Sequence, residues 1–223
     1  MNQEYRQYLE NKNVVIVGPA PYMEGSNYGE VINNYDIVVR INKSVPIPEE
    51  LKCDIGNRTD ILYNCLEPHP DSGGIVDSKM WKSQGVKWIS SPYPPIPPFV
   101  NDIVRFQNNN TENIPFNIFD GEYYNEIATS LKTRPNSGIL AMADLLCYNI
   151  KTLRVLGFTL YKGGYYQQYR PWDEEKVFDI IKRGGNHHQD RQAPFIASII
   201  KDDSRVIVDE HLINAIKSFG VEI

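Results

Sequence analysis

The sequence predicts an α/β protein whose central sheet is Rossmann-like, mostly parallel and flanked by helices. Three observations lead to this prediction. Short apolar runs alternate with longer amphipathic segments almost throughout the chain. The first run, at residues 14–17, is a β-branched stretch (VVIV) that ends in a Gly-Pro turn. A helical segment and a second apolar run, YDIVVRI at 35–41, follow it, and this order of elements opens a βαβ unit with parallel strands.

The remaining elements follow from the same patterns. Strands are expected at residues 60–64, 86–90, 116–119, 153–157 and 205–208, where short apolar runs are bounded by turn-forming residues. Helices are expected near residues 27–34, 74–84, 99–109, 122–132, 138–149, 174–183, 190–201 and 209–219. Residues 91–98 (SPYPPIPP) are excluded from a central strand, because proline has no N–H for the ladder. They are predicted to form a surface loop or, alternatively, the rim of a ligand site.

Composition limits the class of protein. The chain has 223 residues and 41% hydrophobic content, which predicts one domain over residues 1–223. Its net charge of -5 argues against a nucleic-acid-binding protein, which needs clustered positive charge. Three cysteines cannot all pair within one chain, so a reducing compartment, the cytoplasm, is expected. No apolar run reaches the ~18 residues of a spanning helix. A transmembrane segment is therefore not expected, while peripheral membrane contact stays open.

Two strand ends carry candidate ligand-binding residues. The turn at Gly18 leads from a strand towards a helix, where unpaired peptide N–H groups can bind an anion. It lacks the G-x-G-x-x-G pattern, and Pro19 and Pro21 remove two donors, so a nicotinamide cofactor is disfavoured and a purely structural turn stays an alternative. Asn42 follows the second strand. Because ligands of parallel sheets lie outside the carboxyl ends of the strands, its amide is expected to reach a ligand.

A third candidate is the start of the apolar helix expected from residue 138. Asn136 or Ser137 is predicted to cap that helix. Gly138 would lie in its first turn, where the missing side chain lets a ligand approach the backbone. We therefore expect a helix terminus that faces a ligand.

The fourth candidate is the adjacent pair His187 and His188, which follows two glycines and precedes a helix. An imidazole in such a loop suits a general base, because its pKa lies near neutrality. The alternative is a polar helix cap. The three cysteines lack the spacing of zinc ligands, and neighbouring histidines rarely share an ion, so no metal site is expected. Neither a nucleophile elbow nor a Walker A loop nor a D-x-D pair is present.

Taken in order, these pieces resemble the motifs of the family 29 glycosyltransferases, the sialyltransferases. Residues 14–44, continuing to CDIGNRTDILYN at 53–64, are similar to the large sialylmotif, with its V-G-N-S-like turn, G-x-x-Y-G-like segment and D-x-V-x-R-x-N strand. Residues 134–158 (RPNSGILAMADLLCYNIKTLRVLGF) resemble the small sialylmotif, P-S-T-G followed by a helix and a strand ending in Gly-Phe. His187, five residues before Gln192, resembles the last motif, H-x4-E.

The chain departs from the family pattern at several positions. Pro19 stands where the family has a nucleotide-contacting Asn, and Gln192 stands where it has Glu. The His-aromatic-aromatic-acid motif has no clear copy, but Tyr165 and Tyr166 occupy about its place, so the resemblance assigns the phosphate contact to Tyr166. The Cys of the family near Val14 is missing, as are the membrane anchor and stem of Golgi members. A soluble bacterial or viral-type member is therefore expected.

The resemblance implies a variant GT-A fold and an inverting, metal-independent transfer of sialic acid, or a related keto-acid sugar such as Kdo, from a CMP-activated donor to a glycan hydroxyl. His187 would be the general base, with His188 as the alternative. The residues implied to contact the donor are Gly18, Pro19, Asn42, Asn136, Ser137, Gly138 and Tyr166. The expected partners are a CMP-sugar and a glycan acceptor, with acceptor specificity at residues 91–99 and 161–170.

Two other classes of function stay open at this stage. One is a nucleotide-sugar hydrolase or a phosphotransferase on the same fold. The other is a CMP-sugar-binding protein without catalysis, for which Pro19 and Gln192 are the grounds.

Overall fold

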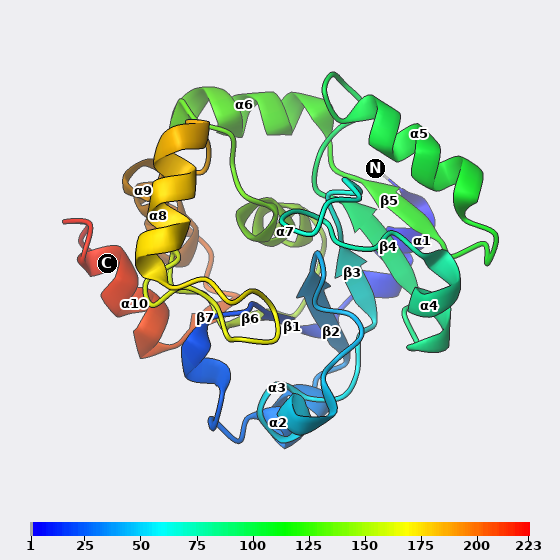
Figure 1. The fold of residues 1–223 in the computed structure, drawn as a ribbon, viewed down its shortest axis with the longest axis horizontal. Helices are drawn as coiled ribbons and strands as arrows, with labels where there is room; N and C mark the ends of the chain where they lie inside the picture. The colour runs from blue at the N-terminus through cyan, green and yellow to red at the C-terminus, as the bar shows by residue number, and fades with distance from the viewer. Residues whose placement is uncertain (1) are drawn as a thin grey trace.

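The computed structural model describes residues 2–223 and contains a seven-stranded sheet in which every neighbouring pair of strands is parallel (Figure 1). The strand order is β5-β4-β3-β2-β1-β6-β7. The strands are β1 Asn13–Val17, β2 Ile37–Ile41, β3 Ile61–Tyr63, β4 Trp88–Ser91, β5 Phe116–Ile118, β6 Thr152–Leu156 and β7 Val206–Val208. Each predicted strand is confirmed within two residues, and the predicted parallel sheet is confirmed as well.

Every predicted helix is also present, although several are shorter than expected. The helices are α2 Gly29–Asn33, α4 Ser78–Ser83, α5 Val100–Asn109, α6 Gly121–Leu131, α7 Ser137–Leu146, α8 Glu174–Gly184, α9 Gln189–Asp202 and α10 Glu210–Lys217. The sequence patterns miss α1 Gln3–Leu9, α3 Lys52–Ile55 and the short helices η1 Pro21–Met23 and η2 Glu49–Leu51. Helix α1 buries Tyr5 and Leu9 among polar neighbours, which is too sparse an apolar stripe to be recognised.

The sheet is buried on both faces, because alternate residues of each strand point to opposite sides. Val14 and Ile16 of β1 join a cluster that includes Met142 of α7 and residues of α9 and α10. Val15 and Val17 join the opposite cluster, with Met23, Ile32 and Leu51. A further cluster packs α4, α5 and α6 around β3 and β4. Helices on both faces explain why the strands read as continuous apolar runs.

The strand order fixes where a ligand can bind. The chain runs outward from β1 to β5 on one side and then crosses back to place β6 on the other side of β1. The order therefore reverses between β1 and β6, and crevices at the carboxyl edge of such a reversal are the usual ligand sites of open parallel sheets. No helix among residues 2–223 is long and apolar enough to cross a membrane.

A buried polar network fastens α7 to the sheet. Asp144 of α7 is 4% exposed, and its carboxylate accepts hydrogen bonds from the Tyr63 hydroxyl at 2.6 Å and the Asn117 amide at 3.2 Å. The Tyr5 and Tyr63 hydroxyls are 3.0 Å apart, which extends the network to α1. Burial is the main reason that the pKa of Asp144 rises from 3.8 to about 7.

This raised pKa predicts a pH-dependent stability. When the pKa of a carboxyl group is higher in the folded than in the unfolded protein, its contribution to the free energy of unfolding is greatest below the unfolded pKa, near 3.8. This contribution is lost as the pH rises through the folded pKa of about 7. The free energy of unfolding of Asp144→Asn should therefore rise relative to that of the wild type by up to roughly 4 kcal/mol between pH 4 and pH 8. Urea unfolding of both proteins across this range measures the difference. If the free energies of unfolding of the two proteins changed in parallel with pH, Asp144 would not titrate between pH 4 and pH 8.

Candidate active site

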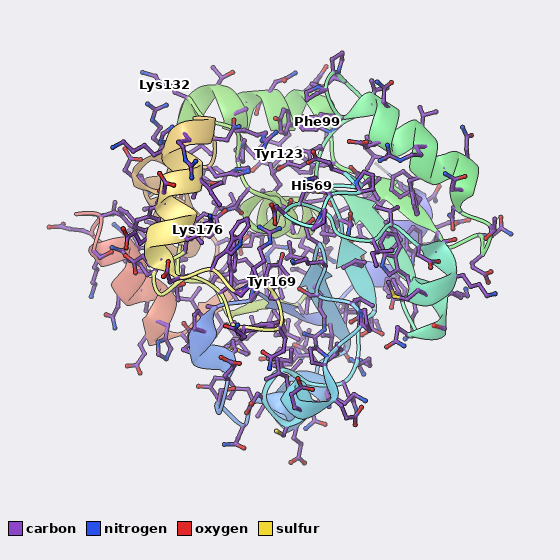
Figure 2. The ribbon with its side chains drawn as sticks, viewed as in Figure 1. His69, Phe99, Tyr123, Lys132, Tyr169 and Lys176 are labelled. Carbon is purple, nitrogen blue, oxygen red and sulfur yellow. The ribbon has the colours of Figure 1, made fainter. Side chains whose placement is uncertain are left out.

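A cavity of about 580 Å³ lies at the carboxyl edge of the sheet, where the strand order reverses. Its size is in the range of small-molecule sites. It is lined by the ends of β1, β2 and β6, the starts of α5 and α7, and the long loop between β6 and α8, which is yellow in Figure 1. Tyr169 from that loop and Phe99 beside α5, both labelled in Figure 2, belong to the lining.

The structure brings most of the predicted site residues together. The cavity is lined by Pro19, Asn42, Asn136, Ser137, Gly138 and His187. The residues of the prediction that do not line it are Gly18, Tyr166 and His188. Whether the lining residues bind a ligand stays a prediction, but their convergence from four separate segments is what a site requires.

The Gly18 turn offers no donor to an anion. Its own N–H donates to the Leu156 carbonyl at 2.8 Å, and the Ala20 N–H donates to the Gly157 carbonyl at 3.0 Å. Pro19 and Pro21 have no N–H. Residues 18–21 therefore contain no free peptide N–H for the phosphate that the sequence had led us to expect there. Gly18 instead permits β1 and β6 to approach, since a Cβ there would lie 2.4 Å from the Gly157 oxygen.

The start of α7 does offer free donors. Asn136 is the N-cap, as predicted, and its side-chain oxygen accepts the Ile139 N–H at 2.9 Å. Within residues 2–223 the Ser137 and Gly138 N–H groups have no protein partner, and both residues line the cavity. A Cβ on Gly138 would lie 2.4 Å from the Phe158 ring, so this glycine also serves packing.

Gln192 supports this helix start. Its side chain is fully buried, and its Oε1 accepts the Asn136 N–H at 2.9 Å. A carboxylate would accept the same hydrogen bond, so the replacement of the family's Glu by Gln192 preserves the contact. The departure from the motif at this position therefore does not disturb the cap of α7.

Asn42 follows β2 with a φ of 51°, in the left-handed region that asparagine tolerates. Its N–H donates to the Tyr63 carbonyl at 2.7 Å, and its side-chain oxygen accepts the Cys65 N–H at 3.0 Å. These two bonds fix the side chain at the ends of β2 and β3. Its amide NH₂ is left as the group that can bind a ligand in the cavity.

The geometry separates the two histidines. His187 lines the cavity, and its Nδ1 lies 2.8 Å from the Arg134 carbonyl. Because a carbonyl oxygen only accepts, Nδ1 carries the proton and Nε2 keeps its lone pair. Burial, then Arg134, lowers the pKa of His187 to about 4. His188 is instead the N-cap of α9 and donates its N–H to Thr133 at 3.4 Å.

The tyrosine predicted to contact the phosphate does not line the cavity, whereas three other tyrosines of the same loop do. Tyr166 is 3% exposed and packs in the core cluster beneath β1 and β2, with its N–H on the Pro19 carbonyl. The tyrosines of the same loop that line the cavity are Tyr161, Tyr165 and Tyr169. The structure does not place Tyr166 in the lining of this cavity, so its contact with a phosphate stays a prediction. An irregular loop has no periodicity from which side-chain direction can be read.

Two arginines that line the cavity were not predicted as site residues from the sequence. Arg134 and Arg170 both line it, and the Nε of each is buried without a hydrogen-bond partner within residues 2–223. Neither forms an ion pair with a carboxylate of the described chain. Arg134 directly precedes the helix-capping motif, which was a usable signal, whereas nothing local marks Arg170. No cluster of three potential metal ligands occurs among residues 2–223.

Comparison with known proteins gives one family and a set of similar folds. Residues 2–94 match the model described as glycosyltransferase family 29 (sialyltransferase). This match confirms the resemblance that the sequence motifs predicted. No curated protein sequence matches the chain significantly.

Two solved structures illustrate the similarity of fold. A mammalian sialyltransferase in complex with Gal-beta-1-3GalNAc-ortho-nitrophenol is 16% identical, with a TM-score of 0.57 over 92% of this chain and 71% of that one. The sialyltransferase CstII from Campylobacter jejuni, in complex with the substrate analogue CMP-3FNeuAc, is 12% identical, with a TM-score of 0.57 over 88% and 81% of the two chains. At these identities the comparison establishes the shared fold.

Proposed function

We propose, from the premise that residues 2–94 carry the signature of glycosyltransferase family 29, that this chain is a sialyltransferase-type enzyme that uses a CMP-activated donor. It transfers sialic acid, or a related keto-acid sugar, to a glycan hydroxyl with inversion and without a metal ion. The similar structures in complex with CMP-3FNeuAc and with a disaccharide acceptor support the two substrate classes. Residues 1–223 act as a single catalytic domain in this proposal.

One observation of the structure carries the proposal. The cavity holds two guanidinium groups, Arg134 and Arg170, with buried and unpartnered Nε atoms and no carboxylate partner within residues 2–223. A buried cation without a countercharge is costly, so the cavity favours a ligand that brings anions. A CMP-linked keto-acid sugar brings two, the phosphate and the sugar carboxylate. A neutral sugar on a nucleoside monophosphate would bring only one anion.

The side chains define the steps of transfer. The acceptor oxygen attacks the anomeric carbon, which has oxocarbenium character in the transition state, while the bond to the phosphate breaks and CMP leaves with the electron pair. His187 Nε2 takes the proton of the acceptor hydroxyl. The free Ser137 and Gly138 N–H groups at the start of α7, together with the cavity arginines, stabilise the charge that develops on the leaving phosphate. These fixed donors remove the need for a metal in the proposed mechanism.

A ligand screen tests the donor class. CMP should raise the melting temperature of the protein selectively over UDP, GDP and NAD, because a ligand of the native state stabilises it by mass action. A shift with UDP or NAD and none with CMP would contradict the proposal.

Asn42→Asp tests the predicted nucleotide contact. Aspartate keeps the oxygen that accepts the Cys65 N–H and tolerates the positive φ, but it removes the NH₂ donor. The variant should bind CMP at least ~10-fold more weakly in calorimetry while unfolding near the wild-type temperature. An unchanged dissociation constant would remove Asn42 from the donor site.

A further inference from the structure

One arginine joins two of the segments that line the cavity. The first follows β3 and contains Glu67, Asp71 and Ser72; the second is the loop from β6 to α8. Arg170 of the second segment donates from Nη2 to the Ser72 carbonyl of the first at 3.0 Å. The side chain therefore links two stretches of the cavity lining that are 98 residues apart in sequence.

The surroundings of Arg170 hold its side chain in place without neutralising it. Arg170 is 8% exposed, and its guanidinium lies 5.1 to 5.3 Å from the ring centroids of Tyr165, Tyr169 and Trp172. Aromatic faces attract a cation but carry no net charge. Its Nε is buried and has no partner within the described chain. Asp71 contributes attraction at longer range and does not form an ion pair with it.

Arg105 of α5 contacts the same segment after β3, but its side chain has a carboxylate partner. It donates to the Leu66 carbonyl at 2.8 Å, much as Arg170 donates to Ser72. Unlike Arg170, it also pairs with the Asp102 carboxylate at 2.6 Å. Both arginines anchor the segment after β3 through a main-chain oxygen. Only Arg170 keeps a donor for something that the chain itself does not supply.

The position of Arg170 indicates which anion it receives. Lys43, which follows β2 closely, lies 5.5 Å from the centroid of the Tyr169 ring, and Arg170 lies over the same ring, so the guanidinium belongs to the side of the cavity at the end of β2. Tyr161, Tyr165 and Tyr169, whose hydroxyls can donate to an anion, line the same cavity. A guanidinium among hydroxyl donors suits a phosphate, which has several oxygens to satisfy, better than a planar carboxylate.

We propose that Arg170 binds the phosphate of the CMP donor and that this contact ties the two lining segments together at the leaving group. The inference rests on the proposed function and adds a residue to it. As the bond to the sugar breaks, the phosphate gains one negative charge, so its attraction to Arg170 is stronger in the transition state than in the bound donor. Arg170 thus contributes both to donor affinity and to turnover.

The test compares CMP with cytidine, which lacks the phosphate, in calorimetry on the wild type, Arg170→Gln and Arg105→Gln. Arg170→Gln should weaken CMP binding by ~10- to 100-fold and leave cytidine binding unchanged. Arg105→Gln, the matched control, should alter the two ligands equally. CMP, but not cytidine, should also protect the loop from β6 to α8 against proteolysis in the wild type and not in Arg170→Gln.

The outcomes separate the two proposals. Equal weakening of CMP and cytidine by Arg170→Gln would assign a purely structural role to Arg170 and overturn the inference, as would an unchanged CMP affinity. If Arg170→Gln does not fold, Arg170→Lys keeps the charge and should retain part of the preference for CMP over cytidine; loss of all preference with retained cytidine binding would contradict charge recognition. Failure of the wild type to bind CMP would overturn the proposed function itself.

Discussion

His187→Ala is expected to lower turnover by ~10²- to 10⁴-fold while leaving the affinity for CMP largely unchanged. The Nδ1 proton of His187 is committed to the Arg134 carbonyl, so its Nε2 is the proton acceptor available in the cavity. Removing the ring removes the base and leaves the α7 terminus and the arginines in place. Steady-state kinetics with a CMP-sugar, combined with CMP calorimetry, measures the two effects separately.

The pH profile of kcat/KM sharpens this prediction. A general base works in its unprotonated form, and the pKa of His187 in the free enzyme is lowered to about 4, mainly by burial. The acidic limb of the wild-type profile should therefore fall near pH 4, well below the 6.5 of an ordinary histidine. The limb should be absent from the residual activity of His187→Ala.

His188→Ala is the control. His188 does not line the cavity, so this variant should retain most of the wild-type turnover. Loss of activity in His188→Ala together with near-normal turnover in His187→Ala would reverse the assignment of the base.

Gly18→Ala is expected to destabilise the fold by ~2–4 kcal/mol and to lower the melting temperature by on the order of 10 °C. A Cβ at Gly18 would lie 2.4 Å from the Gly157 carbonyl oxygen and 2.8 Å from the Phe158 ring. Gly18 and Gly157 directly follow the paired strands β1 and β6, so relieving this contact would require the ends of the two strands to separate. Thermal unfolding of the purified variant measures the loss.

Gly184→Ala provides the comparison for that measurement. Nothing lies within 4 Å of a Cβ at Gly184, at the end of α8, and alanine favours helix. This variant should be as stable as the wild type or slightly more so. A Gly18→Ala protein that unfolds at the wild-type temperature would show that β1 and β6 do not approach as closely as described.

The fold was predictable because its determinants are local. The β-branched runs at residues 14–17 and 35–41 are strands in any context that buries both faces, and their alternation with helices leaves few arrangements other than a parallel sheet. Helix α1 was missed because tertiary packing, not periodicity, holds it: Tyr5 and Leu9 are its buried residues, and Asn2 caps it.

The candidate site was predictable only where local structure positions the side chain. Asn136 caps a helix and Asn42 ends a strand, so both could be placed from the sequence. The loop that carries Tyr166 has no period, and Leu160 and Tyr161 adopt positive φ, so sequence order does not indicate which of its tyrosines line the cavity. The lack of an ion pair at Arg170 could not be predicted from the sequence, because it depends on where the tertiary fold places the carboxylates of distant residues.

CMP release with and without a glycan acceptor, in the presence of EDTA, tests the central claim most directly. We predict that CMP-sialic acid or a related CMP-keto-acid sugar releases CMP only when an acceptor hydroxyl is supplied, because His187 acts on that hydroxyl and because the peptide and arginine donors take the place of a metal. Release of CMP at the same rate without an acceptor would instead identify a hydrolase, and activity that disappears in EDTA and returns with a divalent cation would contradict the metal-free mechanism.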